Sequence, residues 1–328
     1  MIFLKKPLII LTGPTAVGKT KLSISLAKAV NGAIISADSM QVYRYMDIGS
    51  AKIRPEEMCG VSHYLIDALD PSEEFHVVKF VEMAHEAMEK IYAAGQIPIV
   101  TGGTGFYIQA LLKEVDFTDS HGELPIRKEL EAKAATEGGA AELYRELSEL
   151  DPASAEMIHP NNVKRVIRAL EYYHETGQRI SEHNEEQKQK ESPYCAAYFV
   201  LNDERSILYE RIDKRVDQMI RDGLVEEVAH LKEMGYTPDL VSMQGLGYKE
   251  LFPYLAGECT LEEAVYIIKR DTRHFAKRQL TWFRREKDVI WLNKPDFDYN
   301  EEKILSYLLE RWNEIVSADA QGKGDETC

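Results

Sequence analysis

The segment GPTAVGKT, residues 13–20, has the residue types and the spacing of a phosphate-binding loop. It fits the pattern G-x-x-x-x-G-K-[ST], in which two glycines are followed by Lys19 and Thr20. The backbone N–H groups of such a loop and the dipole of the next helix attract an anion, and the lysine reaches the terminal phosphate. The Thr20 hydroxyl is the expected Mg²⁺ ligand. The alternative is a strand–turn–helix with a chance lysine. The residues expected to bind a diphosphate or triphosphate are Gly13, Pro14, Thr15, Ala16, Val17, Gly18, Lys19 and Thr20.

A carboxylate that would mark a nucleotide hydrolase is missing from its usual place. NTP hydrolases and many kinases hold their metal with an Asp that follows a second apolar strand. Here the apolar residues 97–100 are followed by Thr101, and Asp67 in HYLID is a weak substitute. A motor-type ATPase is therefore disfavoured. A small-molecule kinase stays open, with Asp38 accepting a hydroxyl proton, although Asp38 could equally be a helix N-cap or a loop carboxylate.

The elements that must position these residues alternate between strands and helices. Strands are predicted at 7–12, 33–37 and 97–101, and helices at 18–30 and 75–94. This alternation indicates an α/β fold with a parallel sheet. Sites in such sheets lie at the carboxyl ends of the strands. The glycine loop, Asp38 with Ser39, and residues 101–104 all follow predicted strands.

The sequence texture changes after about residue 113. Helical patterns rich in Glu, Lys and Ala cover 125–137, 140–149 and 161–176, and a strand returns at 195–201. Residues 204–234 and 261–286 are again helical. We therefore expect a core made of residues 1–114 and 195–316, a helical insertion domain at 115–194, and a disordered tail at 317–328.

Composition bounds the class of protein. The 328 residues carry a net charge of −15, which by itself disfavours a nucleic-acid partner. Four scattered cysteines form no C-x-x-C pair, and no apolar stretch approaches the roughly 20 residues of a membrane span. A cytoplasmic, reduced protein without membrane contact is expected, and a monomer is the simple expectation.

One helix runs against the acidic average. Between Lys269 and Lys287 there are eight Lys or Arg residues and two acids, and several of the cations share one helical face. This excess predicts contact with a polyanion, with a solvated charged face as the alternative. A smaller cluster, at Lys164, Arg165 and Arg168, could instead pair with glutamates along its own helix.

Together these motifs resemble the bacterial tRNA dimethylallyltransferases, also called tRNA isopentenyltransferases. The resemblance covers nearly all of residues 8–286, and Ser50 departs from a threonine that is frequent in the family. It implies a P-loop NTPase-like parallel sheet core flanked by helices, with no C-terminal zinc finger. The matching segments are GPTAVGKT, SADSMQVYR, DIGSAK, HYLID, TGGTGFY, NVKRVIRALEYYHETG, GLVEEV, GYKEL and AKRQLTWFRRE.

The resemblance implies a reaction and roles for its residues. A dimethylallyl group passes from its diphosphate to N6 of adenine 37, beside the anticodon, in the presence of Mg²⁺. By resemblance Asp38 binds N6 and takes its proton, Thr104 reaches the bridging oxygen, and Lys19 and Arg215 hold the phosphates. The partners would be the tRNA anticodon stem-loop and dimethylallyl diphosphate.

Further residues are expected to contact the RNA, with Gln41 as a candidate for reading the base. Tyr248 or Trp282 could stack on a base or could be core residues. The full set implied for RNA binding is Asp38, Ser39, Met40, Gln41, Arg127, Asn162, Val163, Lys164, Arg165, Val166, Gln244, Gly245, Leu246, Gly247, Tyr248, Lys249, Lys277, Arg278, Gln279, Leu280, Thr281, Trp282, Phe283 and Arg284.

Overall fold

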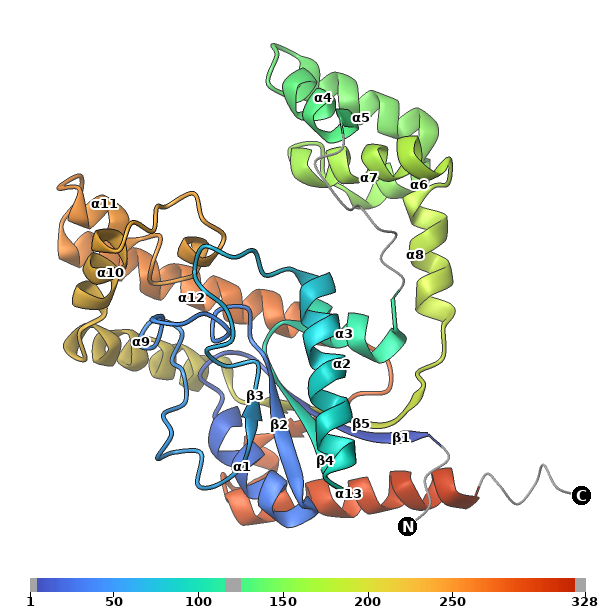
Figure 1. Ribbon diagram of the computed structural model, residues 1–328, viewed down its shortest axis with the longest axis vertical. Helices are drawn as coiled ribbons and strands as arrows, with labels where there is room; N and C mark the ends of the chain where they lie inside the picture. Colours follow the sequence, from blue (N-terminus) through green and yellow to red (C-terminus); the bar gives the residue numbers. More distant parts are fainter. Residues whose placement is uncertain (1–4, 116–124, 322–328) are drawn as a thin grey trace, which may run out of the picture. The chain divides into compact units, whose positions relative to one another are not determined.

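The computed structural model describes residues 5–115 and 125–321 (Figure 1). The chain divides into two compact units. Unit 1 contains Met1–Leu112 and Pro193–Cys328, and unit 2 contains Lys113–Ser192. Unit 1 is therefore built from two stretches of chain, with unit 2 inserted between them.

Unit 1 is built on a six-stranded sheet in the order β3-β2-β4-β1-β5-β6. All neighbouring strands are parallel, so their carboxyl ends lie along one edge. β1 and β4 are the central pair, and they place Thr12 opposite Gly102. The strands are β1 (Lys6–Thr12), β2 (Gly32–Ala37), β3 (His63–Tyr64), β4 (Ile97–Gly102), β5 (Tyr194–Asn202) and β6 (Ile290–Asn293).

Apolar side chains on both faces of the sheet hold the helices. Successive residues of β1 point to opposite faces, so Leu8 and Ile10 enter one core cluster and Ile9 and Leu11 the other. Strands that are buried on both faces of a sheet consist of nearly continuous apolar residues. α1 (Lys19–Val30) and α13 (Glu301–Gln321) pack on one face, and α2 (Val77–Ala93) packs on the other.

The remaining helices of unit 1 extend the core beyond the sheet. They are α3 (Gly105–Lys113), α9 (Arg205–Arg221), α10 (Leu224–Glu233), η1 (Ser242–Gln244), α11 (Leu251–Leu255), α12 (Leu261–Phe283) and η2 (Lys294–Phe297). α12 packs against α9 (Figure 1). Its start is fixed by a capping box, in which Thr260 and Glu263 exchange hydrogen bonds with each other's backbone.

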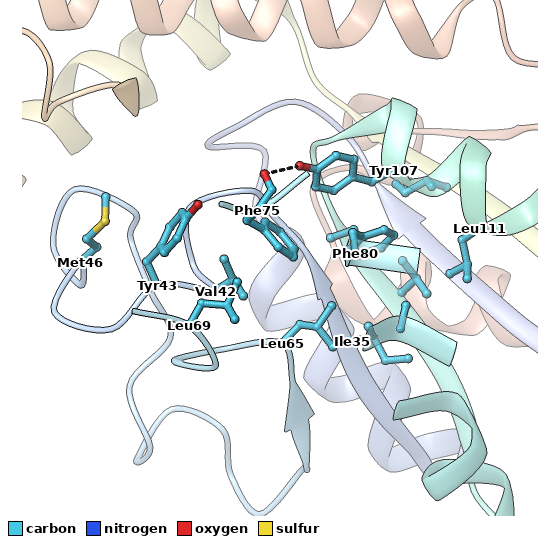
Figure 2. Close-up of a cluster of buried hydrophobic side chains, with 14 of the residues drawn as sticks. Ile35, Val42, Tyr43, Met46, Leu65, Leu69, Phe75, Phe80, Tyr107 and Leu111 are labelled. Carbon is cyan, nitrogen blue, oxygen red and sulfur yellow. Dashed lines mark hydrogen bonds between the residues drawn. The ribbon is translucent and has the colours of Figure 1, made fainter. Parts of the chain in front are cut away.

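An aromatic cluster anchors the segment that follows β2 (Figure 2). The Phe75 ring lies edge-on to Tyr43 and to Tyr107, at centroid distances of 6.4 and 5.6 Å. Phe80 stacks on Tyr107 at 4.8 Å, and the Tyr107 hydroxyl donates to the carbonyl of Phe75. Residues 38–47, which lead into the site described below, are thereby fastened to α2 and α3.

Unit 2 is a small helical domain with its own core. Its helices are α4 (Pro125–Ala134), α5 (Gly139–Leu150), α6 (Pro152–Met157), α7 (Val163–Thr176) and α8 (Ile180–Gln189). They bury a cluster of aliphatic side chains that includes Leu130, Leu143, Leu147 and Leu170. The two ends of the insertion lie side by side, because the ammonium group of Lys113 donates to the carbonyl of Lys190 at 2.8 Å.

The structure departs from the sequence expectations at several boundaries. The helical stretch 204–234 is two helices, because Gly223 adopts a left-handed φ of 102° that ends α9 and starts α10. The tail was expected to begin at residue 317, but α13 continues to Gln321, with Val316 still buried. The remainder of that segment, 322–328, lies outside the described residues. Within the described ranges, no helix combines the length and apolar content of a membrane span.

Candidate active site

The glycine loop between β1 and α1 has the backbone of a phosphate cradle. Gly13 has φ 148°, and a Cβ there would lie 2.2 Å from the carbonyl oxygen of Leu201. Gly18, at φ 99°, is the N-cap residue of α1, so the N–H groups of the first turn face the loop. Thr15, Ala16, Lys19 and Thr20 line a cavity of about 620 Å³. The loop therefore presents backbone donors and a helix N-terminus to this cavity.

Lys19 is folded back over its own loop. Its ammonium group donates to the carbonyls of Gly13 and Pro14, each at 2.9 Å. Burial lowers the pKa of Lys19 to about 8, while the Asp38 carboxylate opposes the shift and Arg215 adds to it. The ammonium is thus held at the cavity with few compensating charges, where an anion would be its natural partner.

Asp38 and Arg215 face the same cavity from other elements. Asp38 follows β2 directly, and one carboxylate oxygen accepts the Met40 N–H at 2.9 Å, while the other makes no hydrogen bond within the described residues. Arg215 lies on α9 and also lines the cavity. Burial lowers the pKa of Arg215, and Asp38 raises it. Two cations and one carboxylate therefore converge from α1, α9 and the β2 end.

Gln279 of α12 ties the phosphate loop to the loop that follows β4. Its amide oxygen accepts from the Thr15 N–H at 2.9 Å, and its amide nitrogen donates to the Gly103 carbonyl at 3.0 Å. A Cβ at Gly103 would lie 2.0 Å from that amide nitrogen, so a larger residue there would displace the Gln279 amide from these hydrogen bonds. Both polar ends of this buried side chain are used within the protein. Gln279 fixes two strand-end loops against each other.

The comparisons with known proteins agree on one family. Residues 41–286 match the family model described as IPP transferase. A tRNA dimethylallyltransferase of Lachnoclostridium phytofermentans is 64% identical over 93% of this chain and 97% of its own length. The corresponding protein of Acetivibrio thermocellus is 51% identical over 92% and 95% of the two chains.

The chain belongs to the IPP transferase family.

Solved structures of family members share the fold. The full-length tRNA isopentenylpyrophosphate transferase from Bacillus halodurans has a TM-score of 0.72 and 44% identity, over 96% of this chain and all of its own. A eukaryotic dimethylallyltransferase solved acting on tRNA has a TM-score of 0.77 and 33% identity, over 96% and 78% of the chains. The P-loop-like parallel α/β fold and the bacterial family resemblance expected from the sequence are both confirmed.

Some of the predicted site residues of this IPP transferase line the cavity, and others do not. Thr104 is half-buried next to the lining residue Gly103, and its N–H donates to the Ala37 carbonyl at 3.3 Å. Gly13, Pro14, Val17, Ser39 and Met40 also lie outside the lining. The predicted residues that line it are Thr15, Ala16, Gly18, Lys19, Thr20, Asp38, Gln41, Arg215 and Gln279.

Gln41 was predicted to read a base, but its amide is already used. The amide oxygen accepts from the Ser36 hydroxyl at 3.0 Å. The amide nitrogen donates to the carbonyls of Ser50 and Ala51, at 3.3 and 3.4 Å. Gln41 is thus a brace between the end of β2 and the segment 47–51.

Several residues expected to contact RNA have side chains in the core. Tyr248 and Phe283 have no exposed surface, and Val166 is 1% exposed within the core of unit 2. Tyr248 is therefore a core residue and not a stacking surface, because its ring packs on Gly49. Trp282 is half-buried against Gly105, with Phe106 edge-on at 6.1 Å. The sequence alone leaves both a stacking role and a core position open for Tyr248 and Trp282.

The basic helix α12 divides into a paired half and an unpaired half. Lys269 and Arg273 form ion pairs with Asp217 and Asp213 of α9, at 2.5 and 2.6 Å. Counting the charges along the sequence does not reveal these ion pairs, because the partner residues lie over 50 positions away. Four cations between residues 277 and 285, two in α12 and two just after it, are exposed and have no ion pair among the described residues: Lys277, Arg278, Arg284 and Arg285.

The basic cluster of unit 2 divides similarly. Arg168 pairs with the buried Glu171 at 3.0 Å, as the alternative interpretation of that helix held. Arg127 lies 3.7 Å from the same carboxylate. Lys164 and Arg165 are exposed, and the structure gives them no ion pair within the described part of the chain.

Part of the cavity wall comes from residues to which the sequence assigned no role. The segment 47–52 contributes Asp47, Ile48, Ser50, Ala51 and Lys52. α9 contributes more than Arg215, since one face of it lines the cavity. Four lining residues lie three, four or seven positions from Arg215, which is the spacing of one helical face, and this was the available signal: Arg211, Gln218, Met219 and Asp222.

Proposed function

We propose that this chain is a tRNA dimethylallyltransferase. It moves the dimethylallyl group of dimethylallyl diphosphate to N6 of adenine 37, next to the anticodon, and releases diphosphate. The family membership and the activities by which the relatives are named support this proposal. Because tRNA is its proposed substrate, we place the enzyme in the cytoplasm.

One structural observation supports it most directly: the phosphate loop and Asp38 line one cavity. In the proposed reaction the bond between the allylic carbon and the bridging oxygen breaks, and a bond from N6 to that carbon forms. Negative charge grows on the departing diphosphate. The loop N–H groups, Lys19 and Arg215 stabilise that charge electrostatically.

Asp38 is the proposed proton acceptor. An exocyclic amine is a poor nucleophile, because its lone pair is delocalised into the ring, and it must lose a proton as it is alkylated. Asp38 has a carboxylate oxygen to spare and lies on the cavity wall. Adenine 37 would leave the anticodon stack to reach it, at a cost of a few kcal/mol.

The cavity fits a magnesium ion at Thr20. Mg²⁺ is usually held by one or two protein oxygens together with substrate phosphates and water. Thr20 lines the cavity in the first turn of α1, and the carboxylate of Asp222 belongs to the lining of the same cavity. When bound, the ion would neutralise part of the charge on the leaving diphosphate.

The decisive experiment uses unmodified tRNA and labelled dimethylallyl diphosphate, without ATP. We expect label in the RNA with the wild-type protein. Asp38→Ala should still bind tRNA and lose most of its turnover, because the proton acceptor is gone. Near-normal turnover in that variant would remove Asp38 from the mechanism.

The main rival is a small-molecule kinase that uses the same loop. It predicts transfer of the γ-phosphoryl group of ATP to an acceptor and no reaction with the prenyl donor. The four exposed cations between residues 277 and 285, which form no ion pair with any described residue, disfavour it because a small acceptor would not use them. Phosphoryl transfer with prenyl donors ignored would overturn the proposed function.

A further inference from the structure

The carboxylate of Glu227 binds three successive backbone N–H groups that lie about half the chain away in sequence. They belong to Asp47, Ile48 and Gly49, at 2.9, 2.8 and 3.1 Å. Successive N–H groups of this kind form a concave anion-binding nest. Glu227 itself lies in the first turn of α10, where the helix dipole favours a negative charge. The nest is therefore filled by a carboxylate of the protein's own.

Tyr248 completes this arrangement from a third segment. Its hydroxyl donates to Glu227 at 2.7 Å, and its ring is fully buried. A Cβ at Gly49 would lie 2.5 Å from that ring, so only glycine lets the tyrosine approach. Burial, and then the nearby carboxylate, raise the pKa of Tyr248, so the phenol stays protonated and keeps donating.

The segment held by Glu227 is a wall of the site. Asp47, Ile48, Ser50 and Ala51 line the cavity that contains the phosphate loop. The Gln41 amide donates to the carbonyls of Ser50 and Ala51. Ala51 has φ 48°, a left-handed conformation that needs support in a residue other than glycine. The wall is therefore fixed at both its N–H groups and its carbonyls.

We propose that Glu227 and Tyr248 are positioning residues that hold the wall 47–51 in the conformation that accepts the prenyl donor. Neither residue lines the cavity, so they act through the backbone they hold. The proposal rests on the proposed function for its kinetic test. It gives one physical task to three separate motifs, DIGSAK, GLVEEV and GYKEL, which meet at a single carboxylate.

The test compares Glu227→Gln, Tyr248→Phe and the neighbouring exposed control Glu226→Gln. Glu227→Gln keeps the shape of the side chain and loses the charge. Tyr248→Phe removes one hydrogen bond and leaves the three N–H bonds in place. Each full-length variant is assayed for donor KM, tRNA KM and kcat, and for hydrogen exchange at amides 47–49. Thermal unfolding is recorded to detect general loss of structure.

We expect Glu227→Gln to lower kcat/KM for the donor by about 10²-fold, the scale seen when a site is misplaced by about 1 Å. The tRNA KM should stay close to wild type, and amides 47–49 should exchange faster. Tyr248→Phe should show the same pattern more weakly, and Glu226→Gln none of it. A structural role alone would lower the unfolding temperature without separating the donor KM from the tRNA KM.

Two outcomes overturn the proposal. One is a donor kcat/KM in Glu227→Gln equal to that of Glu226→Gln. The other outcome is used if Glu227→Gln does not fold. It is the finding that Tyr248→Phe has wild-type donor kinetics and unchanged hydrogen exchange at amides 47–49. If the wild-type protein transfers no prenyl group, the proposed function fails on its own. The positioning role is then decided by the exchange rates and by the affinity for dimethylallyl diphosphate, measured by calorimetry.

Discussion

The ammonium group of Lys19 shows how the site balances charge at the scale of one residue. It donates to two carbonyls of its own loop, and burial brings its pKa to about 8. Asp38 raises that pKa and Arg215 lowers it, so the two neighbours oppose each other. Lys19 therefore loses its proton more readily than an exposed lysine. An anion such as diphosphate bound close to it would raise the pKa again.

This balance predicts a pH dependence of diphosphate binding. Below pH 8 the ammonium is charged in the free protein, and binding needs no proton. Above pH 8 binding must take up a proton, so affinity should fall by up to about tenfold per pH unit relative to a variant that stays charged. Lys19→Arg is that variant, because a guanidinium does not titrate in this range.

Calorimetry with inorganic diphosphate between pH 7 and 9.5 measures the difference. Titration of the diphosphate itself is common to both proteins and cancels in the comparison. We expect wild type to show proton uptake above pH 8, seen as a heat that changes with the ionisation enthalpy of the buffer. Parallel pH profiles for wild type and Lys19→Arg would contradict the assignment of Lys19 to the phosphate.

At the scale of one element, α12 has two separate tasks along its length. Its first half pairs with acids of α9, which fastens the two helices together. Its buried Gln279 braces two loops of the site. Its last turns and the two residues after it carry four exposed cations. The cations that remain available for the predicted polyanion contact therefore lie at the end of the helix and just after it.

This division predicts which arginines and lysines set the salt dependence of tRNA binding. Lys277→Ala and Arg284→Ala should each weaken binding and reduce the slope of log K against log[salt] by about one. Arg273→Ala is the matched control, because its charge is already balanced by Asp213. Filter binding from 50 to 300 mM salt gives the slopes, with concentrations chosen to span the range in which phosphate contacts weaken. Equal slopes in all three variants would remove this end of α12 from the RNA contact.

At the scale of the whole molecule, the sequence predicted the α/β core well because its signals are local. The run of apolar residues 7–12 and the loop 13–20 together place a phosphate cradle at a strand end. The two-residue strand β3 and the four-residue strand β6 were not predicted, since such short strands carry almost no periodicity. The helix 204–234 was predicted as continuous, and only the conformation of Gly223 divides it.

The site was predictable where one motif carries it, and not where distant segments share it. Lys19, Thr20 and Asp38 follow strands that the pattern identifies. Gln41 acts as a brace because its amide donates to the carbonyls of Ser50 and Ala51. The residues next to Gln41 in the sequence do not predict these hydrogen bonds. The role of Glu227 depends on amides about 180 residues away. Pairings of this kind follow from tertiary packing, which one sequence does not reveal.

The inserted unit 2 has the organisation of an independent domain. It has its own aliphatic core, and its ends are joined by the hydrogen bond from Lys113 to Lys190. Domains with adjacent ends and separate cores can be inserted or removed with little effect on the host fold. We therefore propose that residues 1–112 and 193–328 fold without it.

Replacing 113–192 by a linker of about six Gly and Ser residues, an ordinary loop length, tests this organisation. We expect a cooperatively folded protein that binds inorganic diphosphate as tightly as wild type, because every residue lining the cavity lies outside the insertion. Its tRNA affinity should fall roughly tenfold or more, since the exposed Lys164 and Arg165 are removed. The full-length Lys164→Ala/Arg165→Ala double variant separates loss of these charges from loss of the domain. An excised protein that fails to fold, or one that binds tRNA with wild-type affinity, would show that unit 2 is not an independent RNA-binding insertion.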